Sequence, residues 1–291
     1  MKVAIYGRVL QEQDVPYVRE LIASLSSYEV EIKFHEVFFK FIKQSIDLPS
    51  KFELFFNSKD IGEVDFVISV GGDGTLLDVV TIVGGSGIPV IGINTGRLGF
   101  LSSINKSQIP EVVKAIVNGK YSIEERSLLS LESNISLFGS SNYALNEFAL
   151  HKKDVSSLIV VHTYINGQFL NSFWADGLII STPTGSTAYN LSCGGPIVFP
   201  NSNNFVINPV APHNLTQRPI VVSDDCIISF EIEGRSNQFL CTLDSRIETV
   251  DSNIQMAVKK ADFTIKTLRI ETDDFMTTLR NKMMWGIDKR N

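Results

Sequence analysis

The sequence predicts an α/β N-terminal domain with a parallel, Rossmann-like sheet, followed by a β-rich C-terminal domain. Over residues 1–120, apolar strand-like runs alternate with segments whose apolar residues recur at helical spacing, a pattern typical of βαβ units. Over residues 121–270, strand-like runs follow one another with little helical periodicity. In residues 271–291, Phe275 and Leu279 share one helical face, and we expect this C-terminal helix to pack back on the first domain.

Short patterns define each element of the first domain. Phe66–Val70 is a continuous run of the kind found in a buried parallel strand, and Asn118-Gly119 marks the end of the last helix. The expected strands are Val3–Tyr6, Ile32–Phe34, Phe66–Val70 and Pro89–Ile93, and the expected helices are Val15–Leu25, Glu36–Gln44, Leu76–Val83 and Ile109–Val117.

The second domain is expected to be β-rich. Asn166-Gly167 separates two strand-like runs and is a strong hairpin signal, because both residues accept a positive φ. Asp274 and its neighbours supply capping groups for the C-terminal helix. The expected strands are Leu128–Leu131, Tyr143–Leu150, Leu158–Ile165, Phe205–Ile207, Ile227–Ile232, Phe239–Leu243 and Phe263–Ile270.

Composition narrows the class of protein. The 291 residues carry a net charge of −6 and no cluster of lysine and arginine, so neither nucleic acid nor an anionic membrane is an expected partner. The three cysteines, Cys193, Cys226 and Cys241, have no disulfide or metal-site spacing. No apolar run approaches the roughly 20 residues that span a bilayer. We therefore expect a cytoplasmic protein.

A glycine-rich loop, Gly71-Gly72-Asp73-Gly74-Thr75, directly follows the buried strand and opens a helix. Such a loop favours phosphate, because its backbone approaches closely and the N–H groups of the first helical turn face the ligand. It is neither a Walker A loop nor a GxGxxG fingerprint. Asp73 is unusual beside phosphate: it suits a metal-organising residue or a general base, or simply a helix cap.

Gly71–Thr75 resembles the motif shared by NAD kinases, lipid kinases of the diacylglycerol and sphingosine type and, more distantly, phosphofructokinases. Four further segments narrow this resemblance to the NAD kinase family. They are Ile93–Leu101, Leu145–Glu147, Asp176–Tyr189 and Pro209–Pro219, of which Asp176–Tyr189 is the most specific. The resemblance implies that Asp73 is the catalytic base and that Gly71, Gly72, Gly74 and Thr75 form the phosphate loop.

The resemblance also implies a set of substrate-binding residues, and their chemistry agrees with it. Glu147 can accept from both hydroxyls of a ribose, Asn146 can bind the edge of a heterocycle, and Tyr189 offers a flat face to a base. Asp176 and Ala211 are expected at the nicotinamide end, from a neighbouring subunit. The full expected set is Asp73, Gly74, Phe100, Asn146, Glu147, Asp176, Thr187, Ala188, Tyr189, Ser192 and Ala211.

Each of these residues has a structural alternative when taken alone. A Thr-Gly-Ser-Thr run is usually a plain loop, Asn146-Glu147 a surface pair, Tyr189 a core residue, and Phe100 either core or ligand contact. The chain also departs from the family pattern at three places. Asp244-Ser245-Arg246 replaces Asp-Gly-Gln, and Trp174 and Asp78 stand where basic residues are common.

The expected reaction is transfer of the γ-phosphoryl group of ATP, or of another triphosphate or polyphosphate, to the 2′-hydroxyl of the adenosine ribose of NAD. The implied cofactor is a divalent ion, Mg²⁺, held mainly by the ATP phosphates, and the implied assembly is a homodimer or homotetramer. The expected site lies in the crevice between the domains. The rival functions are a lipid kinase, a non-catalytic NAD(P) sensor and a Rossmann dehydrogenase; the absence of GxGxxG disfavours the last.

Overall fold

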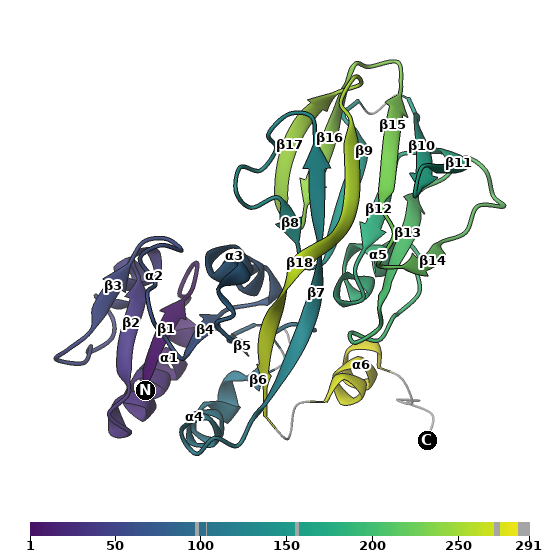
Figure 1. Ribbon diagram of the computed structural model, residues 1–291. Coiled ribbons are helices and arrows are strands. Elements are labelled where there is room, and N and C mark those ends of the chain that lie inside the picture. Colours follow the sequence, from purple (N-terminus) through teal and green to yellow (C-terminus); the bar gives the residue numbers. More distant parts are fainter. Residues whose placement is uncertain (97–98, 103, 155–156, 271–273, 285–291) are drawn as a thin grey trace, which may run out of the picture. The chain divides into compact units, whose positions relative to one another are not determined.

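The chain folds into two compact units in the computed structural model, which describes residues 1–96, 99–102, 104–154, 157–270 and 274–284. The first unit comprises Met1–Glu124 and Ile265–Asn291, and the second comprises Glu125–Thr264. Two long strands, β7 (Ser122–Ser133) and β18 (Met256–Arg269), contribute residues to both units (Figure 1). Within the described residues, no helix is long and apolar enough to cross a membrane.

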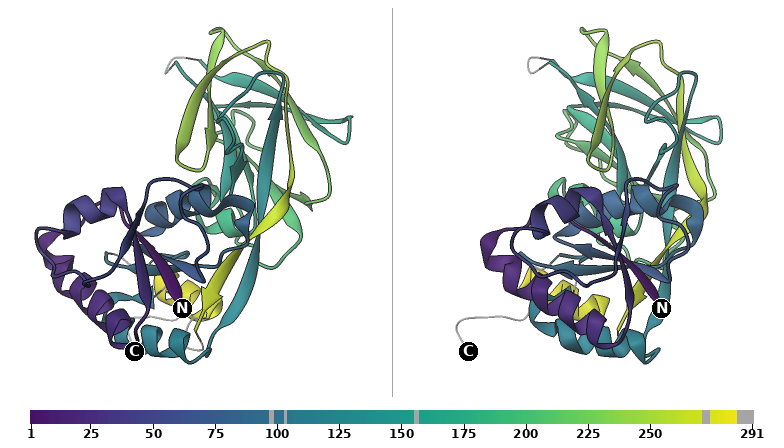
Figure 2. Two further views of the ribbon diagram at one scale, coloured as in Figure 1. Left: turned by 60° about the vertical axis from the view of Figure 1, so that its left-hand side comes forward. Right: turned by 90° about the vertical axis from the view of Figure 1, so that its left-hand side faces the viewer.

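The first unit is a parallel sheet with helices on both faces (Figure 2). Its strands are β1 (Lys2–Tyr6), β2 (Glu31–His35), β3 (Glu53–Phe55), β4 (Phe66–Val70), β5 (Val90–Asn94) and β6 (Ile104–Asn105). Its α-helices are α1 (Val15–Ser27), α2 (Glu36–Ile42), α3 (Asp73–Val83), α4 (Ile109–Val117) and α6 (Phe275–Met283), with short 3₁₀ turns at Glu12–Asp14, Gly84–Ser86 and Lys106–Gln108.

The strand order of this sheet is β3-β2-β1-β4-β5, with the end of β18 parallel to β5. From β1 the chain adds β2 and β3 on one side, and the next strand, β4, pairs with β1 on its other side. This reversal is the topological switch point at which open α/β sheets bind ligands, at the carboxyl ends of the strands. All five residues of β4 are buried, as its apolar run predicts.

The second unit is made of antiparallel strands around a separate core. One sheet has the order β14-β13-β12-β9-β16-β17, and β11, β10, β15 and β18 pair in series in the other, where β7 pairs with β18 and β8. Phe148 of β9 and Phe230 of β15 stack with ring centroids 5.3 Å apart, so the two sheets share this core. The remaining bounds are β8 (Tyr143–Ala144), β9 (Glu147–Lys152), β10 (Ile159–Ile165), β11 (Gln168–Ala175), β12 (Gly177–Ser181), β13 (Asn204–Val210), β14 (Ile220–Ser223), β15 (Ile228–Glu233), β16 (Gln238–Leu243), β17 (Arg246–Asp251), the 3₁₀ turn η4 (Thr184–Thr187) and α5 (Tyr189–Ser192).

The predicted fold class is confirmed in both halves. The C-terminal helix α6 belongs to the first unit, where its Leu279 is buried and the ammonium of Lys282 lies 5.6 Å from the ring centre of Phe100. Two predicted strands are parts of longer ones: Leu128–Leu131 lies within β7, and Phe263–Arg269 lies within β18. A third predicted strand is divided. The run Tyr143–Leu150 is not a single strand, because Leu145 and Asn146 interrupt it between β8 and β9.

Candidate active site

The glycine loop lies where β4 ends and α3 begins. The Gly71 N–H donates to the carbonyl of Ile93 at 3.0 Å, which ties the loop to the neighbouring strand β5. Gly72 is the N-cap of α3 and supplies no side-chain cap, and a methyl group added there would meet no atom within 4 Å. The start of α3 is therefore open above Gly72. The Thr75 N–H donates to the Gly72 carbonyl at 3.0 Å, whereas the first N–H groups of a helix otherwise lack intrahelical acceptors.

Asp73 is the first residue of α3, yet its carboxylate does not cap that helix. Oδ2 accepts the N–H of Phe100 at 2.9 Å, and Oδ1 accepts those of Leu101 at 3.1 Å and Ser102 at 2.8 Å. The approach is so close that a Cβ on Gly99 would lie 1.8 Å from Oδ1. Asp73 thus holds the segment after β5 against the glycine loop, a role that the sequence pattern does not predict.

The two carboxylate oxygens of Asp73 are not equally engaged. Within the described residues, Oδ1 accepts two backbone N–H groups, whereas Oδ2 accepts one. A carboxylate offers about four acceptor positions in all. Oδ2 therefore retains capacity for a further partner, such as a hydroxyl proton or a cation.

The second unit brings two of the predicted motifs together. Asn146 and Glu147 lie at the start of β9, and the Thr182 N–H donates to the Asn146 carbonyl at 2.9 Å. Gly185, in the turn η4, passes so close that a Cβ there would lie 2.0 Å from the same carbonyl oxygen. The Asn-Glu pair and the Thr184–Tyr189 turn therefore form one packed constellation, although about 40 residues separate them in the chain.

Unpartnered polar atoms concentrate in this constellation. Asn146 is 7% and Glu147 8% exposed, and neither Asn146 Oδ1 nor Glu147 Oε2 has a hydrogen-bond partner among the described residues; the same holds for Thr184 Oγ1. Burial raises the pKa of Glu147 to about 8, the charge of Asp244 adds to this, and the backbone N–H of Tyr189 opposes it. Such buried and unsatisfied groups are costly in an empty protein and are the expected mark of a ligand site.

Asp244 explains why the chain breaks between β8 and β9. Its carboxylate accepts the N–H groups of Leu145 at 3.0 Å, Asn146 at 2.8 Å and Glu147 at 3.2 Å, so these donors leave the sheet ladder. Burial raises the pKa of Asp244, while these donors and Arg246 lower it. The sequence marks this turn only through the neighbouring departures Ser245 and Arg246, and no linear signal connects Asp244 to residues about 100 positions earlier.

Arg246 has a structural role in the same turn. Its guanidinium donates to the carbonyls of Ser141 and Tyr143 and lies 5.7 Å from the ring centre of Phe138. Burial lowers the pKa of this guanidinium, and the charge of Asp244 opposes the change. Arg246 therefore fixes the chain before β9 instead of reaching toward a ligand.

Other predicted site residues lie nearby on the same unit. Thr187, Ala188 and Tyr189 are half-buried, and the Tyr189 ring lies 5.5 Å from the imidazole of His151. Ser192, at the end of α5, is exposed. Burial raises the pKa of Tyr189 most, Cys193 adds to this, and the charge of the buried Glu147 adds further. Tyr189 therefore lies close to Glu147.

Asp176 and Ala211 lie at the paired ends of β12 and β13. The Asp176 N–H donates to the carbonyl of Val210 at 2.9 Å, and its carboxylate forms an ion pair with Lys152 at 2.5 Å. Ala211 is exposed and has φ +46°, an uncommon conformation for a residue with a side chain. The Asp176 carboxylate is therefore engaged within its own chain.

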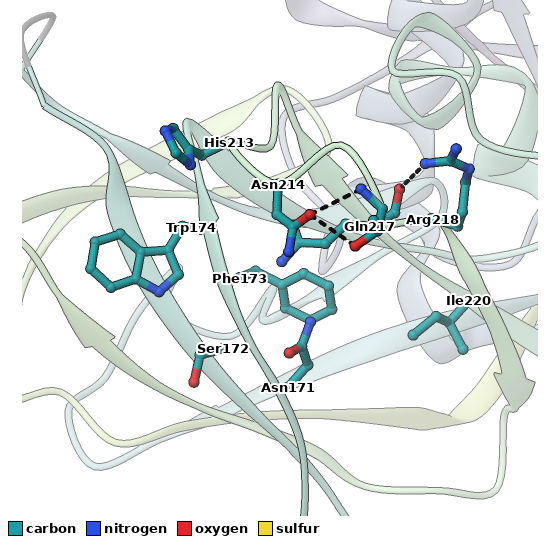
Figure 3. Close-up of a pocket in the computed structure, with 10 residues that line it drawn as sticks. Asn171, Ser172, Phe173, Trp174, His213, Asn214, Gln217, Arg218 and Ile220 are labelled. Carbon is teal, nitrogen blue, oxygen red and sulfur yellow. Dashed lines mark hydrogen bonds between the residues drawn. The ribbon is translucent and has the colours of Figure 1, made fainter.

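A pocket of about 700 Å³ lies between β11 and the loop that follows β13 (Figure 3). Trp174 lines it from β11, and His213 and Arg218 line it from the loop after β13. The His213 N–H donates to the Trp174 carbonyl at 2.8 Å, and Arg218 donates to two carbonyls of its own loop. Trp174 is 56% exposed. It therefore gives the pocket an apolar surface at a position where a basic residue is common in the family pattern.

Comparison with known proteins gives one consistent family. Residues 17–121 match the ATP-NAD kinase N-terminal domain, and residues 145–270 match the ATP-NAD kinase C-terminal domain. The chain is 50% identical to an NAD kinase of Cytophaga hutchinsonii over 289 residues, and this aligned region covers 99% of each chain. It resembles the structure of an NAD kinase from Archaeoglobus fulgidus in complex with ATP, with a TM-score of 0.74, 26% identity and 98% of each chain covered. Yeast NADH kinase complexed with NADH shares the fold, with a TM-score of 0.87, 24% identity, and 99% of this chain and 89% of that chain covered.

Proposed function

This chain belongs to the NAD kinase family, and we propose that it transfers the γ-phosphoryl group of ATP to the 2′-hydroxyl of the adenosine ribose of NAD, giving NADP. The observation that carries the proposal lies beside Tyr189: Asn146 Oδ1 and Glu147 Oε2 are buried and have no hydrogen-bond partner in the part of the chain that the structure describes. An adenosine supplies a base edge for the amide, a ribose diol for the carboxyl and a flat ring for the phenol.

Glu147 is the residue that we assign to the ribose diol. With a pKa of about 8, this carboxyl is mostly protonated at neutral pH. A neutral carboxyl donates one hydrogen bond and accepts others, so it can pair with one hydroxyl as donor and with the other as acceptor. Binding of the diol then satisfies Oε2, which otherwise has no partner among the described residues.

Asp73 is the residue that we assign to the reacting hydroxyl. Its Oδ2 atom, which has spare acceptor capacity, takes the proton as the 2′-oxygen attacks the γ-phosphorus in line and ADP leaves. The three N–H groups on the carboxylate fix its orientation before substrate arrives. Thr187, Ala188, Ser192, Asp176, Ala211 and Phe100 are proposed substrate contacts, and Gly71, Gly72, Gly74 and Thr75 the phosphate loop.

A divalent ion, Mg²⁺, fits this chemistry as a partner of the donor nucleotide. Among the described residues, no three His, Cys, Asp or Glu side chains gather in a way that would hold a metal ion. Because the free position of Asp73 Oδ2 is assigned to the hydroxyl proton, such an ion would be held mainly by the ATP phosphates. When bound, such an ion neutralises charge on the transferring phosphoryl group.

The reaction is tested with NAD, ATP and Mg²⁺ against 2′-deoxy-NAD in parallel. We expect NADP phosphorylated at the adenosine 2′-oxygen from NAD, and binding without phosphorylation of the deoxy analogue, because the analogue lacks the nucleophile. Mass spectrometry of the products identifies the acceptor. A phosphorylated deoxy product would assign the reaction to another hydroxyl, and phosphorylated lipid diols in place of NADP would overturn the proposal. Parallel assays with NADH in place of NAD, and with polyphosphate in place of ATP, show which acceptors and donors the enzyme uses.

We also propose that the enzyme is a homo-oligomer, in which Asp176 and Ala211 lie near a subunit boundary. The exposed side chain of Trp174 supports this, since large exposed apolar groups favour association. Multi-angle light scattering at micromolar concentration is expected to give a dimer or tetramer. An active monomer would contradict the proposal.

A further inference from the structure

Arg8 lies at the switch point of the first unit, next to the glycine loop. Strands β1 and β4 are parallel neighbours, and Tyr6 of β1 is in register with Ser69 of β4 (Figure 1). Arg8 follows Tyr6 by two residues, and Gly71 follows Ser69 by two residues. The arginine and the loop therefore leave the same edge of the sheet, at the position where this topology binds ligands.

Three side chains form a cluster that orients Arg8. Its Nε and Nη2 atoms donate to the two carboxylate oxygens of Asp78, on the second turn of α3. The hydroxyl of Tyr6 donates to Asp78 Oδ2 at 2.9 Å. One edge of the guanidinium is thus fixed by a two-point pair, which is the geometry in which arginine is most strongly held.

The other side of the guanidinium is turned toward the loop. Arg8 Nη1 lies 3.7 Å from the point that a Cβ of Gly74 would occupy, and the Arg8 side chain is 48% exposed. A guanidinium has five N–H donors, of which the pair with Asp78 uses two. The remaining donors lie beside the open start of α3.

We propose that Arg8 binds the phosphates of the donor nucleotide on the glycine loop, and that Asp78 and Tyr6 position it. The loop itself contains no lysine, carries the acidic Asp73, and belongs to a chain of net charge −6, so a triphosphate needs a local cation. Arg8 supplies that cation from β1 and compensates for the acidic residue at position 78. The inference rests on the proposed kinase reaction, because it assigns the donor nucleotide to this loop.

The test compares Arg8→Ala and Arg8→Lys with Arg235→Ala, which removes an exposed arginine of the second unit. Steady-state kinetics should show KM for ATP raised about tenfold or more in Arg8→Ala, as expected for one lost charge-assisted hydrogen bond. KM for NAD should stay within about twofold. The KM of Arg8→Lys for ATP should lie between those of Arg8→Ala and the wild type, because lysine keeps the charge but not the two-point geometry of the guanidinium. Arg235→Ala should have the KM of the wild type.

Asp78→Asn and the double variant Arg8→Ala/Asp78→Asn test whether Asp78 affects ATP binding through Arg8 or through the stability of the fold. If Asp78 acts through Arg8, the double variant should bind ATP as weakly as Arg8→Ala, without an additional loss. Equilibrium dialysis with ATP alone gives this readout independently of turnover, so failure of the NAD reaction and failure of the Arg8 assignment are distinguishable. An Arg8→Ala variant with unchanged ATP affinity, or with equal losses for ATP and NAD, would overturn the proposal.

Discussion

Replacing Asp73 by Asn is expected to lower kcat by about 10²–10⁴-fold, the usual cost of losing a general base. The amide cannot accept the hydroxyl proton, and it also offers an N–H₂ group where the carboxylate accepts backbone N–H groups. Affinity for NAD should change by only a few-fold, because the groups assigned to the adenosine lie on the second unit. Single-turnover kinetics and NAD titration measure the two effects separately. A variant that keeps more than about a tenth of the wild-type kcat would remove Asp73 from the chemistry.

Gly99→Ala is the matched variant that keeps the carboxylate and disturbs its anchoring. The new methyl group would lie 1.8 Å from Asp73 Oδ1, so either the side chain or the segment from Phe100 to Ser102 must move. If orientation of the carboxylate matters, kcat should fall although Asp73 is still present. Wild-type kcat in Gly99→Ala would show that the three backbone hydrogen bonds are structural only.

Replacing Glu147 by Gln is expected to stabilise the ligand-free protein at pH 8 by on the order of a few kcal/mol. The pKa of Glu147 is raised from 4.5 to about 8, first by burial and then by the charge of Asp244. Below pH 4.5 the carboxyl is protonated in both folded and unfolded chains. As pH rises toward 8, the unfolded chain releases the proton while the folded protein keeps it, so the wild type progressively loses stability over this window. Glutamine has no proton to release.

Urea denaturation at pH 5.5 and pH 8 measures this difference between wild type and Glu147→Gln. The variant should gain stability relative to the wild type as the pH rises, and Glu63→Gln, an exposed carboxyl in the first unit, should show no such gain. Equal slopes of stability against pH for wild type and Glu147→Gln would contradict the buried protonated state. KM for NAD tests the assignment of Glu147 to the ribose. Glu147→Gln should change it little, because glutamine keeps a donor and an acceptor, whereas Glu147→Ala should raise it about tenfold.

The strands and helices that periodicity predicts are largely those of the structure. The run Phe66–Val70 is β4 and Ile109–Val117 is α4, residue for residue, because local apolar spacing reports which face is buried. The strand β12 (Gly177–Ser181) was not expected as a strand. All five of its residues are buried, as in β4, but they stand within Asp176–Tyr189, which the family resemblance identifies as a binding motif and not as a strand.

The sequence alone determined the class of fold and the family. Motifs such as Gly71–Thr75 and Asp176–Tyr189 are contiguous in the chain, so their residue types and order can be recognised without a structure. It did not determine the partners of the key carboxylates. Asp73 accepts from residues 27 to 29 positions later, and Asp244 from residues 97 to 99 positions earlier. Arg8 meets Asp78 only because β1 and β4 are neighbours in the sheet. Such contacts depend on strand order and register, which arise when distant segments pack together and leave no periodic trace in either segment.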